Sequence, residues 1–330
     1  MFFSKGIETP RLVVSGPAMG TSFTVQVVFR RKISPVQYHA RQEKLSRGIG
    51  RIIDSIAERM SFHSPVSEIS RFNQFRENGW FPVSADTARV VSRALKISEQ
   101  SVGAFDITLG PLIAIWGFGP EKKKGTTPAD NEIKEALARV GYRNLQVRLS
   151  PPALKKENPE ICCDLSAIAK GFAVDEVAGY LKSAGYRHYL VEIGGEIKSR
   201  GKNHIHQAWT IGIETPDSDG MGILRAVLLG KNAVATSGDT HVYFEIGGQR
   251  YAHTIDSATG RPLAHNLASV SVIDSSCMKA DALATAILVL GPEKGYEFAL
   301  ESKRPALLIF RQGKGLAVKM TPSFRRYLVK

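Results

Sequence analysis

The hydrophobic positions of the chain follow two different periods. Between residues 21 and 29 every second side chain is apolar, as in a half-buried strand: Phe23, Val25, Val27 and Phe29. Residues 45–60 carry apolar side chains three and four positions apart, which predicts a helix. Further helices are predicted at about 84–101 and 165–184, and within 126–142, where a proline near the start and a glycine at the end are typical helix boundaries.

The second half of the chain is richer in strand-like runs. These lie at 188–193, 208–214, 223–229, 241–246, 250–255 and 268–273. A hairpin turn is predicted at Gly247 and Gly248, and helices at about 278–290 and 292–301 precede two short closing strands. Residues 146–160, rich in proline and charge, are predicted to form a loop or an irregular hairpin. Because strands and helices are segregated, the predicted fold class is α+β, with mostly antiparallel strands.

Composition excludes a few classes of protein and otherwise adds little to the predicted fold. The chain has 330 residues, of which 43% are hydrophobic and 23% charged, as in an ordinary globular protein. Its longest apolar stretches are far shorter than the ~20 residues of a membrane span. A net charge of +13 is compatible with an anionic partner, but the basic residues are scattered and form no nucleic-acid motif, so no nucleic-acid binding is predicted. Three cysteines provide neither a disulfide framework nor a zinc spacing.

The segment 162–171, CCDLSAIAKG, carries an unusual pair of charges at the start of a predicted core helix. Asp164 is expected to accept a backbone N–H of the first turn, and Leu165, Ile168 and Phe172 begin a core-facing stripe. A capped amphipathic helix is the simpler interpretation. The small residues between the charges also allow a ligand to approach the backbone, and a helix N-terminus with Lys170 nearby suits a phosphate.

Two further segments carry candidate chemistry. In KADALATAILVLG, Asp281 and Thr285 lie one helical turn apart, a sparse oxygen set that suits Mg²⁺, although each also has an ordinary helical role. In YAHTIDSATGRPL, His253 stands beside a predicted turn, where a histidine can act as a general base near neutral pH. Glycine-spaced aromatics at 103–120 indicate a tight loop or a wall for a planar ring. The Gly194–Gly195 pair inside a predicted strand indicates a bulge or a ligand close to the main chain.

Taken together and in order, these segments resemble the ApbE-type family of FAD:protein FMN transferases. The matching stretches are MGTSFTV (19–25), SEISRFN (67–73), GAFDITLGPL with WGFGP (103–120), DLSAIAKGFAVD (164–175), VEIGGEI (191–197), ATSGD (235–239), HTIDSATGRP (253–262), LASVSVI (267–273) and ADALATA (280–286). The likeness spans about residues 11–310. It implies a T-fold-like α+β architecture and a single domain over residues 1–330, with two lobes around FAD as a further possibility.

The resemblance also implies an activity and a site. Such enzymes split FAD, attach FMN to a threonine or serine hydroxyl of an acceptor flavoprotein, release AMP and require Mg²⁺. Carried over motif by motif, the implied metal ligands are Asp281, Thr285, the Ala167 carbonyl and Ala284, and the implied base is His253. The implied FAD-contacting residues are Met19, Phe62, Ala104, Phe105, Asp106, Asp164, Lys170 and Ile255. Phe62 replaces the tyrosine or tryptophan often found in the family, which removes a polar contact.

Several points stay open at this stage. The same residues would serve an FAD pyrophosphatase that gives FMN and AMP, while a flavin-binding protein without turnover would need neither metal nor base. Family analogy suggests a respiratory complex subunit as the acceptor. It also implies a periplasmic location at the inner membrane, with the cytoplasm as the alternative. The first ten residues contain no long apolar region, so membrane association is expected only through a leader or lipid anchor that this sequence does not show.

Overall fold

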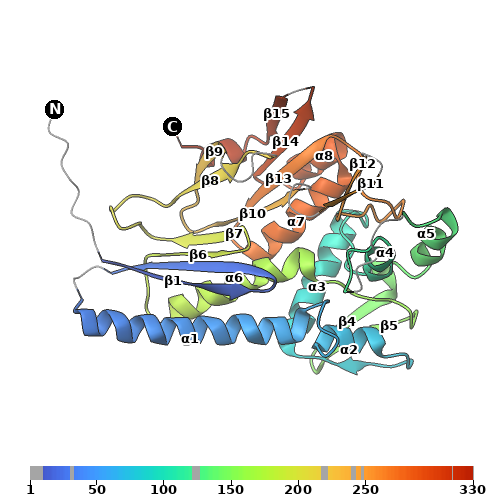
Figure 1. Cartoon of the computed structure of the whole chain (residues 1–330), viewed down its shortest axis with the longest axis horizontal. Coiled ribbons are helices and arrows are strands. Elements are labelled where there is room, and N and C mark those ends of the chain that lie inside the picture. Colours follow the sequence, from blue (N-terminus) through green and yellow to red (C-terminus); the bar gives the residue numbers. More distant parts are fainter. Residues whose placement is uncertain are drawn as a thin grey trace.

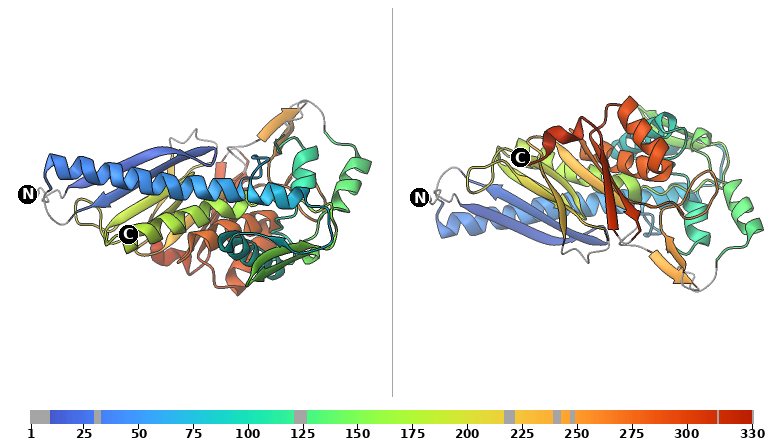
Figure 2. Two further views of the ribbon diagram at one scale, coloured as in Figure 1. Left: turned by 90° about the horizontal axis from the view of Figure 1, so that it is seen from below. Right: turned by 90° about the horizontal axis from the view of Figure 1, so that it is seen from above.

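The computed structural model describes residues 10–29, 33–120, 127–216, 222–238, 243–246, 249–313 and 315–329. Its centre is a sheet of eight strands in the order β1-β2-β6-β7-β10-β13-β14-β15, in which neighbouring strands are antiparallel. Helices pack on one face of this sheet, as Figures 1 and 2 show. The α+β class with antiparallel strands is therefore confirmed.

The strands of the main sheet are β1 (Arg11–Ala18), β2 (Thr21–Val28), β6 (Tyr189–Ile193), β7 (Glu196–Arg200), β10 (Ala233–Gly238), β13 (Leu267–Asp274), β14 (Ala306–Gln312) and β15 (Gly315–Met320). Smaller sheets consist of β3 (Phe81–Pro82), β4 (Leu145–Leu149) and β5 (Pro152–Lys156), of β8 (Thr210–Glu214) and β9 (Ile223–Leu228), and of β11 (Tyr243–Ile246) and β12 (Gln249–Ala252). The helices are α1 (Pro35–Met60), α2 (Glu68–Gln74), α3 (Ala85–Gln100), α4 (Gly110–Ile115), α5 (Asp130–Leu137), α6 (Ser166–Ser183), α7 (Cys277–Leu290) and α8 (Pro292–Glu301), with 3₁₀ turns η1 (Tyr142–Asn144) and η2 (Phe324–Tyr327).

Most predicted elements are present, with three corrections. Residues 146–160, predicted as a loop or an irregular hairpin, contain a hairpin, β4–β5, whose pairing is regular. Gly194 and Gly195 are not a bulge inside a strand. They form the turn between β6 and β7, because both have positive φ, 58° and 95°, the backbone that a tight hairpin turn requires. Strands β1, β7 and β10 were not predicted. The predicted turn at Gly247 and Gly248 lies outside the described residues.

Alternating side chains of the sheet separate two hydrophobic layers. On β14, Ala306 and Leu308 join the core beneath the helices, whereas Leu307 and Ile309 pack with β8, β9 and η2 on the opposite face. This two-residue period is what a sheet covered on both sides demands. Across the described ranges, no helix is both long and apolar enough to cross a membrane.

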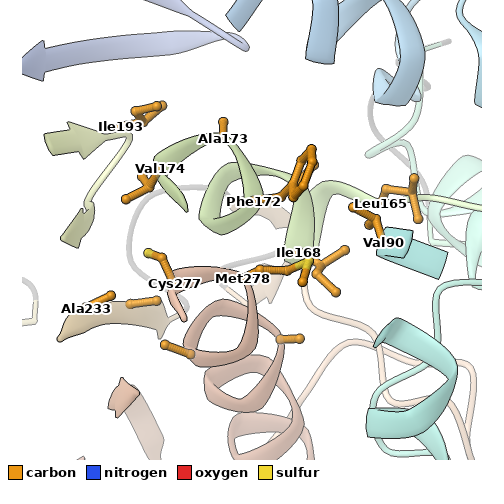
Figure 3. Packing of buried hydrophobic residues seen from close by; sticks show 14 of the residues in the cluster. Val90, Leu165, Ile168, Phe172, Ala173, Val174, Ile193, Ala233, Cys277 and Met278 are labelled. Atoms are coloured by element: carbon orange, nitrogen blue, oxygen red, sulfur yellow. The ribbon is translucent and has the colours of Figure 1, made fainter. Parts of the chain in front are cut away.

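Helix α6 runs through the middle of the helical layer and is buried around most of its circumference. The predicted stripe of Leu165, Ile168 and Phe172 is fully buried, which confirms it. Helix α7 crosses α6 so closely that a Cβ atom on Gly171 would lie 2.5 Å from the Cys277 carbonyl oxygen. Figure 3 shows Cys277 and Met278, at the start of α7, beside α6.

We expect Gly171→Ala to lower the free energy of unfolding by about 1–3 kcal/mol, since the new methyl group overlaps backbone atoms of α7 that have little room to move. Gly179, on the same helix, is the matched control because a Cβ atom there meets nothing within 4 Å. Gly179→Ala should raise the free energy of unfolding by about 0.5–1 kcal/mol. Urea unfolding measures both, and equal effects would contradict the close helix crossing.

Candidate active site

The start of α6 is fixed by side-chain hydrogen bonds. The Asp164 carboxylate oxygen Oδ1 accepts from the backbone N–H of Ser166 at 2.8 Å and from its hydroxyl at 2.6 Å. The expected bond to a first-turn N–H is therefore confirmed, although Leu165 occupies the N-cap position. The Asp164 N–H donates to the Ile107 carbonyl at 2.7 Å, which ties this helix start to the 103–110 loop.

The crossing of α6 and α7 brings two predicted metal ligands together. The Asp281 carboxylate oxygen Oδ2 accepts the backbone N–H of Gly171 at 2.9 Å. In an α-helix that N–H also points at the carbonyl of the residue four positions earlier, here Ala167. The Asp281 carboxylate and the Ala167 carbonyl therefore surround the same N–H group, although they are far apart in the sequence. Asp281 is buried, with 4% exposed.

Thr285 lies one turn after Asp281 on α7, as predicted. Its hydroxyl forms a 2.8 Å hydrogen bond with the hydroxyl of Ser237 at the end of β10. Ser237 belongs to the ATSGD segment but was not predicted as a site residue. Ala284 is completely buried beside Thr285, so only its backbone carbonyl has a metal-binding atom to offer.

Lys170 is paired with a second carboxylate that the sequence did not indicate. Its ammonium lies 2.8 Å from Oε1 of Glu196 and 3.4 Å from the Gly194 carbonyl oxygen. The Glu196 side chain is 2% exposed, and its other oxygen, Oε2, is buried without a hydrogen-bond partner. Lys170 therefore balances the charge of a buried carboxylate. Glu196 could have been suspected only as a charged residue directly after the tight turn of the GGE segment.

The electrostatics of this group are dominated by burial. Burial of the Glu196 carboxyl raises its pKa to about 8, and the negative charge of the nearby Asp281 carboxylate acts in the same direction. The Lys170 ammonium lowers the pKa of Glu196 but offsets only part of this rise. Burial also raises the pKa of Asp281 above its usual value, against the pull of Lys170. Burial alone would lower the pKa of Lys170, but the charges of Glu196 and Asp281 together raise it. Two buried carboxylates thus share one ammonium.

The β1–β2 turn lies beside this group. Met19 adopts a positive φ of 48° there, followed by Gly20 at 80°. The Gly194 N–H donates to the Ser22 carbonyl at 3.0 Å, which joins this turn to the β6–β7 turn. A Cβ atom on Gly194 would lie 2.7 Å from the Thr21 methyl group and 3.2 Å from Cδ of Lys170. Met19, predicted to contact FAD, therefore lies in a turn that is joined to the β6–β7 turn beside Lys170.

The 103–110 loop carries the predicted residues Ala104, Phe105 and Asp106. Phe105 is buried in the main core, and Ala104 is half-buried beside it. Asp106 accepts the N–H of Thr108 at 2.7 Å and that of Tyr142 at 3.0 Å, and burial raises its pKa. This carboxylate therefore holds the shape of the loop.

Phe62 is also buried, at 8% exposed. The hydroxyl of a tyrosine at this position would therefore lie in a largely apolar environment.

His253 and Ile255 lie in a separate part of the molecule. Ile255 is buried in a small cluster with Trp116 of the 103–120 segment, while His253 is exposed, its ring centroid 6.4 Å from that of Phe118. The Ser257 hydroxyl donates to the Gly103 carbonyl at 2.7 Å, and the Trp116 indole N–H to the Gly260 carbonyl at 2.8 Å. These bonds attach the 253–262 segment to the loop that carries Ala104, Phe105 and Asp106.

Asn73 is another residue whose position sequence reasoning missed. Its side-chain amide brackets the backbone of Cys163, donating to the carbonyl at 2.9 Å and accepting the N–H at 2.7 Å. The buried Lys156 ammonium donates to the Asn73 and Ile161 carbonyls, and burial lowers its pKa to about 8. The SEISRFN segment therefore positions the backbone segment that leads into Asp164.

The donor set at the crossing fits a small divalent cation. Over the described residues, no cluster of three or more His, Cys, Asp or Glu side chains is arranged to hold a metal. A metal at Asp281 would have one carboxylate, a backbone carbonyl and a hydroxyl as protein ligands. Mg²⁺ commonly binds through one or two carboxylates and keeps waters and substrate phosphates as its other ligands.

Comparison with known proteins assigns the chain to a family. The ApbE family model matches residues 19–309. The chain belongs to the ApbE family. The FAD:protein FMN transferase of Vibrio cholerae is 39% identical over 98% of this chain and 96% of its own length, and that of Haemophilus influenzae is 38% identical over 97% and 92%. The solved structure of the Vibrio cholerae flavin transferase ApbE superposes with a TM-score of 0.88 at 38% identity, covering 97% of this chain and all of that one. The resemblance drawn from the motifs is confirmed, as is the fold it implied.

The buried Glu196 carboxyl makes the stability of the metal-free protein depend on pH. A carboxyl with a raised folded-state pKa contributes stability that is fully present below about pH 4.5 and is lost as the pH rises through about 8. The free energy of unfolding of the wild type should therefore fall as the pH rises over this range, with a contribution from Glu196 of up to ~1.4 kcal/mol per pH unit. We expect the Glu196→Gln variant to lack this contribution. Urea unfolding from about pH 5 to pH 8 measures it. The exposed Glu160→Gln variant is the control, and identical profiles for wild type and Glu196→Gln would contradict the assignment.

Proposed function

We propose that this chain is an FAD:protein FMN transferase that uses Mg²⁺ and a threonine or serine hydroxyl of an acceptor flavoprotein. In this reaction the hydroxyl oxygen forms a bond to the phosphorus of the FMN half of FAD. The bond from that phosphorus to the bridging oxygen breaks, AMP leaves with that oxygen, and the hydroxyl proton is transferred to a base. The observation that carries the proposal is the hydrogen bond from the Gly171 N–H to the Asp281 carboxylate, in a chain that matches the family over residues 19–309. Helix geometry places the Ala167 carbonyl at the same N–H group.

Asp281, Thr285 and the Ala167 carbonyl, with Ala284 as a further candidate, are the residues that would hold the metal. Bound there, Mg²⁺ would offset the negative charge that develops on the diphosphate oxygens during displacement. The Ser237 hydroxyl supports this role of Thr285 by fixing the position of its hydroxyl oxygen through their 2.8 Å hydrogen bond, in which either hydroxyl can donate. Lys170 adds a fixed positive charge beside the carboxylates and limits their mutual repulsion.

The remaining residues are assigned to the flavin nucleotide and to proton transfer. The residues that would contact FAD are Met19, Phe62, Ala104 to Asp106, Asp164, Lys170 and Ile255. A common surface is supported for part of this set, because Asp164 and the segment that carries Ile255 are both hydrogen-bonded to the 103–110 loop. His253 would accept the proton of the attacking hydroxyl. Its exposure suits this role, since a protein acceptor must reach the base from outside. The periplasmic location and the respiratory acceptor stay predictions.

The deciding experiment combines the protein with FAD, Mg²⁺ and a candidate acceptor flavoprotein, followed by mass spectrometry of the acceptor and chromatography of the nucleotides. We expect FMN on a threonine or serine, with AMP released in equal amount. Release of FMN and AMP without any adduct would support a pyrophosphatase instead. Binding of FAD without AMP release would reject both enzymatic functions.

Removal of the Asp281 carboxylate should slow the reaction far more than it weakens the binding of FAD. We expect Asp281→Ala to lower the rate of AMP release at least 100-fold, because the metal loses its charged ligand, while the Kd for FAD, measured by flavin fluorescence, changes much less. Glu160→Ala, which removes an exposed carboxylate, is the control. Wild-type turnover in the Asp281 variant, or turnover of the native protein in excess chelator, would reject the metal assignment.

Replacement of His253 tests the proposed base. A positioned base contributes roughly 10²–10⁴-fold to a rate, so His253→Ala should slow FMN transfer by a factor in that range and leave FAD binding nearly unchanged. His39, which is exposed and lies outside the matched segments, provides the control variant His39→Ala. Transfer at the native rate by the His253 variant would exclude this residue as the base.

A further inference from the structure

Asp175 lies one turn after Gly171 on α6 and accepts four hydrogen bonds, three of them from the start of α7. Its oxygen Oδ2 accepts from the Ser276 hydroxyl at 2.7 Å and from the Met278 N–H at 3.1 Å. Its oxygen Oδ1 accepts from the Cys277 N–H at 3.0 Å and from the Lys198 ammonium at 2.6 Å. Asp175 is the last residue of the DLSAIAKGFAVD segment.

These bonds make one helix cap another. The first N–H groups of a helix have no partner within it and are normally capped by a residue just before the helix. Ser276 does so for α7 in the usual way, accepting the Lys279 N–H at 3.4 Å. The N–H groups of Cys277 and Met278 are taken instead by Asp175 from α6, where the negative charge also faces the positive end of the α7 dipole. The contact therefore fixes the position of α7 along α6 and also caps the start of α7.

The two helices are thus joined at two points in opposite directions. Asp175 of α6 accepts N–H groups of α7, and Asp281 of α7 accepts the Gly171 N–H of α6. Asp281 follows Cys277 by four residues, close to one helical turn, just as Asp175 follows Gly171. Because a helix turn is rigid, a displacement of the start of α7 moves the Asp281 carboxylate by a similar amount. Figure 3 shows the packing of Cys277 and Met278 against α6 at this point.

We infer that Asp175 is a positioning residue for the active site: its carboxylate sets the place of α7 and so holds Asp281 against the Gly171 N–H and the Ala167 carbonyl. This inference rests on the proposed function for its consequence in catalysis, namely a metal site whose affinity depends on Asp175. The contact itself can be tested without metal, FAD or turnover. Lys198 balances the charge of Asp175, with its ammonium also donating to the Ser275 carbonyl at 2.7 Å.

The test variant is Asp175→Asn, which keeps the shape of the side chain but replaces one acceptor oxygen by a donor that faces N–H groups or an ammonium. Asp274→Asn is the matched control. Asp274 also accepts at the start of α7, from the Ser276 N–H at 3.0 Å, but it is paired with Arg304 rather than with α6. If Asp175→Asn proves too unstable to purify, Ser276→Gly removes one of the four donors to Asp175, together with the cap on the Lys279 N–H, and should produce a smaller effect in the same direction.

The first readout is the amide resonance of Gly171. Labelling lysine with ¹³C at the carbonyl and glycine with ¹⁵N restricts the spectrum to glycines that follow a lysine. The chain has five such pairs: Lys5–Gly6, Lys124–Gly125, Lys170–Gly171, Lys294–Gly295 and Lys314–Gly315. The Gly171 signal is assigned as the one that shifts most in Asp281→Ala. We expect Asp175→Asn to move it in the same direction, and Asp274→Asn to leave it in place.

The second readout is the Mg²⁺ concentration that gives half-maximal AMP release. We expect Asp175→Asn to raise it at least tenfold, with less than a twofold change in the Kd for FAD, while Asp274→Asn raises it less than twofold at a comparable loss of Tm. An unmoved Gly171 signal with unchanged Mg²⁺ dependence would show that Asp175 only stabilises the helix, and would overturn the inference. A moved signal in a protein whose native form needs no Mg²⁺ would reject the metal in the proposed function and leave the positioning contact standing.

Discussion

The close approach of α6 and α7 at Gly171 is the constraint on which the site depends. Any side chain at this position would meet the Cys277 carbonyl and the Asp281 Cβ atom. Only a bare backbone allows the Asp281 carboxylate to reach the Gly171 N–H and so to lie beside the Ala167 carbonyl. The functional arrangement is thus made by backbone proximity at a helix crossing, and its ligands need no special loop.

This arrangement buries charged side chains, and burial of a charge is unfavourable in the protein interior. Asp281 and Glu196 are both buried, and Lys170 is the cation paired directly with one of them. Buried carboxylates without enough positive charge nearby are driven toward the protonated form, which is the direction of the pKa shift for both residues. A site of this kind favours a divalent cation, because the cation restores charge balance while making use of oxygens that are already desolvated. The electrostatics of the crossing are therefore in accord with the proposed metal.

Sequence patterns predicted the parts of this structure that depend on local rules. The period of 45–60 and 278–290 indicated helices because apolar residues facing one core recur at helical spacing, and Asp281 and Thr285 followed as neighbours on α7. Glu196 and Ser237 were missed because their importance comes from partners distant in the chain, Lys170 and Thr285. No local period encodes such contacts. Gly194 and Gly195 were misplaced inside a strand because two glycines are compatible with either a bulge or a turn.

The site combines two units that are stabilised in different ways. The metal-binding candidates lie on α6 and α7, two helices embedded in the main core. The candidate base His253 and the buried Ile255 lie on a segment that is attached to the 103–120 region through the Ser257 and Trp116 hydrogen bonds. The 103–110 loop is in turn bonded to the segment just before α6, where the Asp164 N–H donates to the Ile107 carbonyl at 2.7 Å and the Gly110 N–H to the Cys162 carbonyl at 3.1 Å. The position of His253 relative to the α6–α7 crossing therefore depends on this loop, because the loop is bonded to both units.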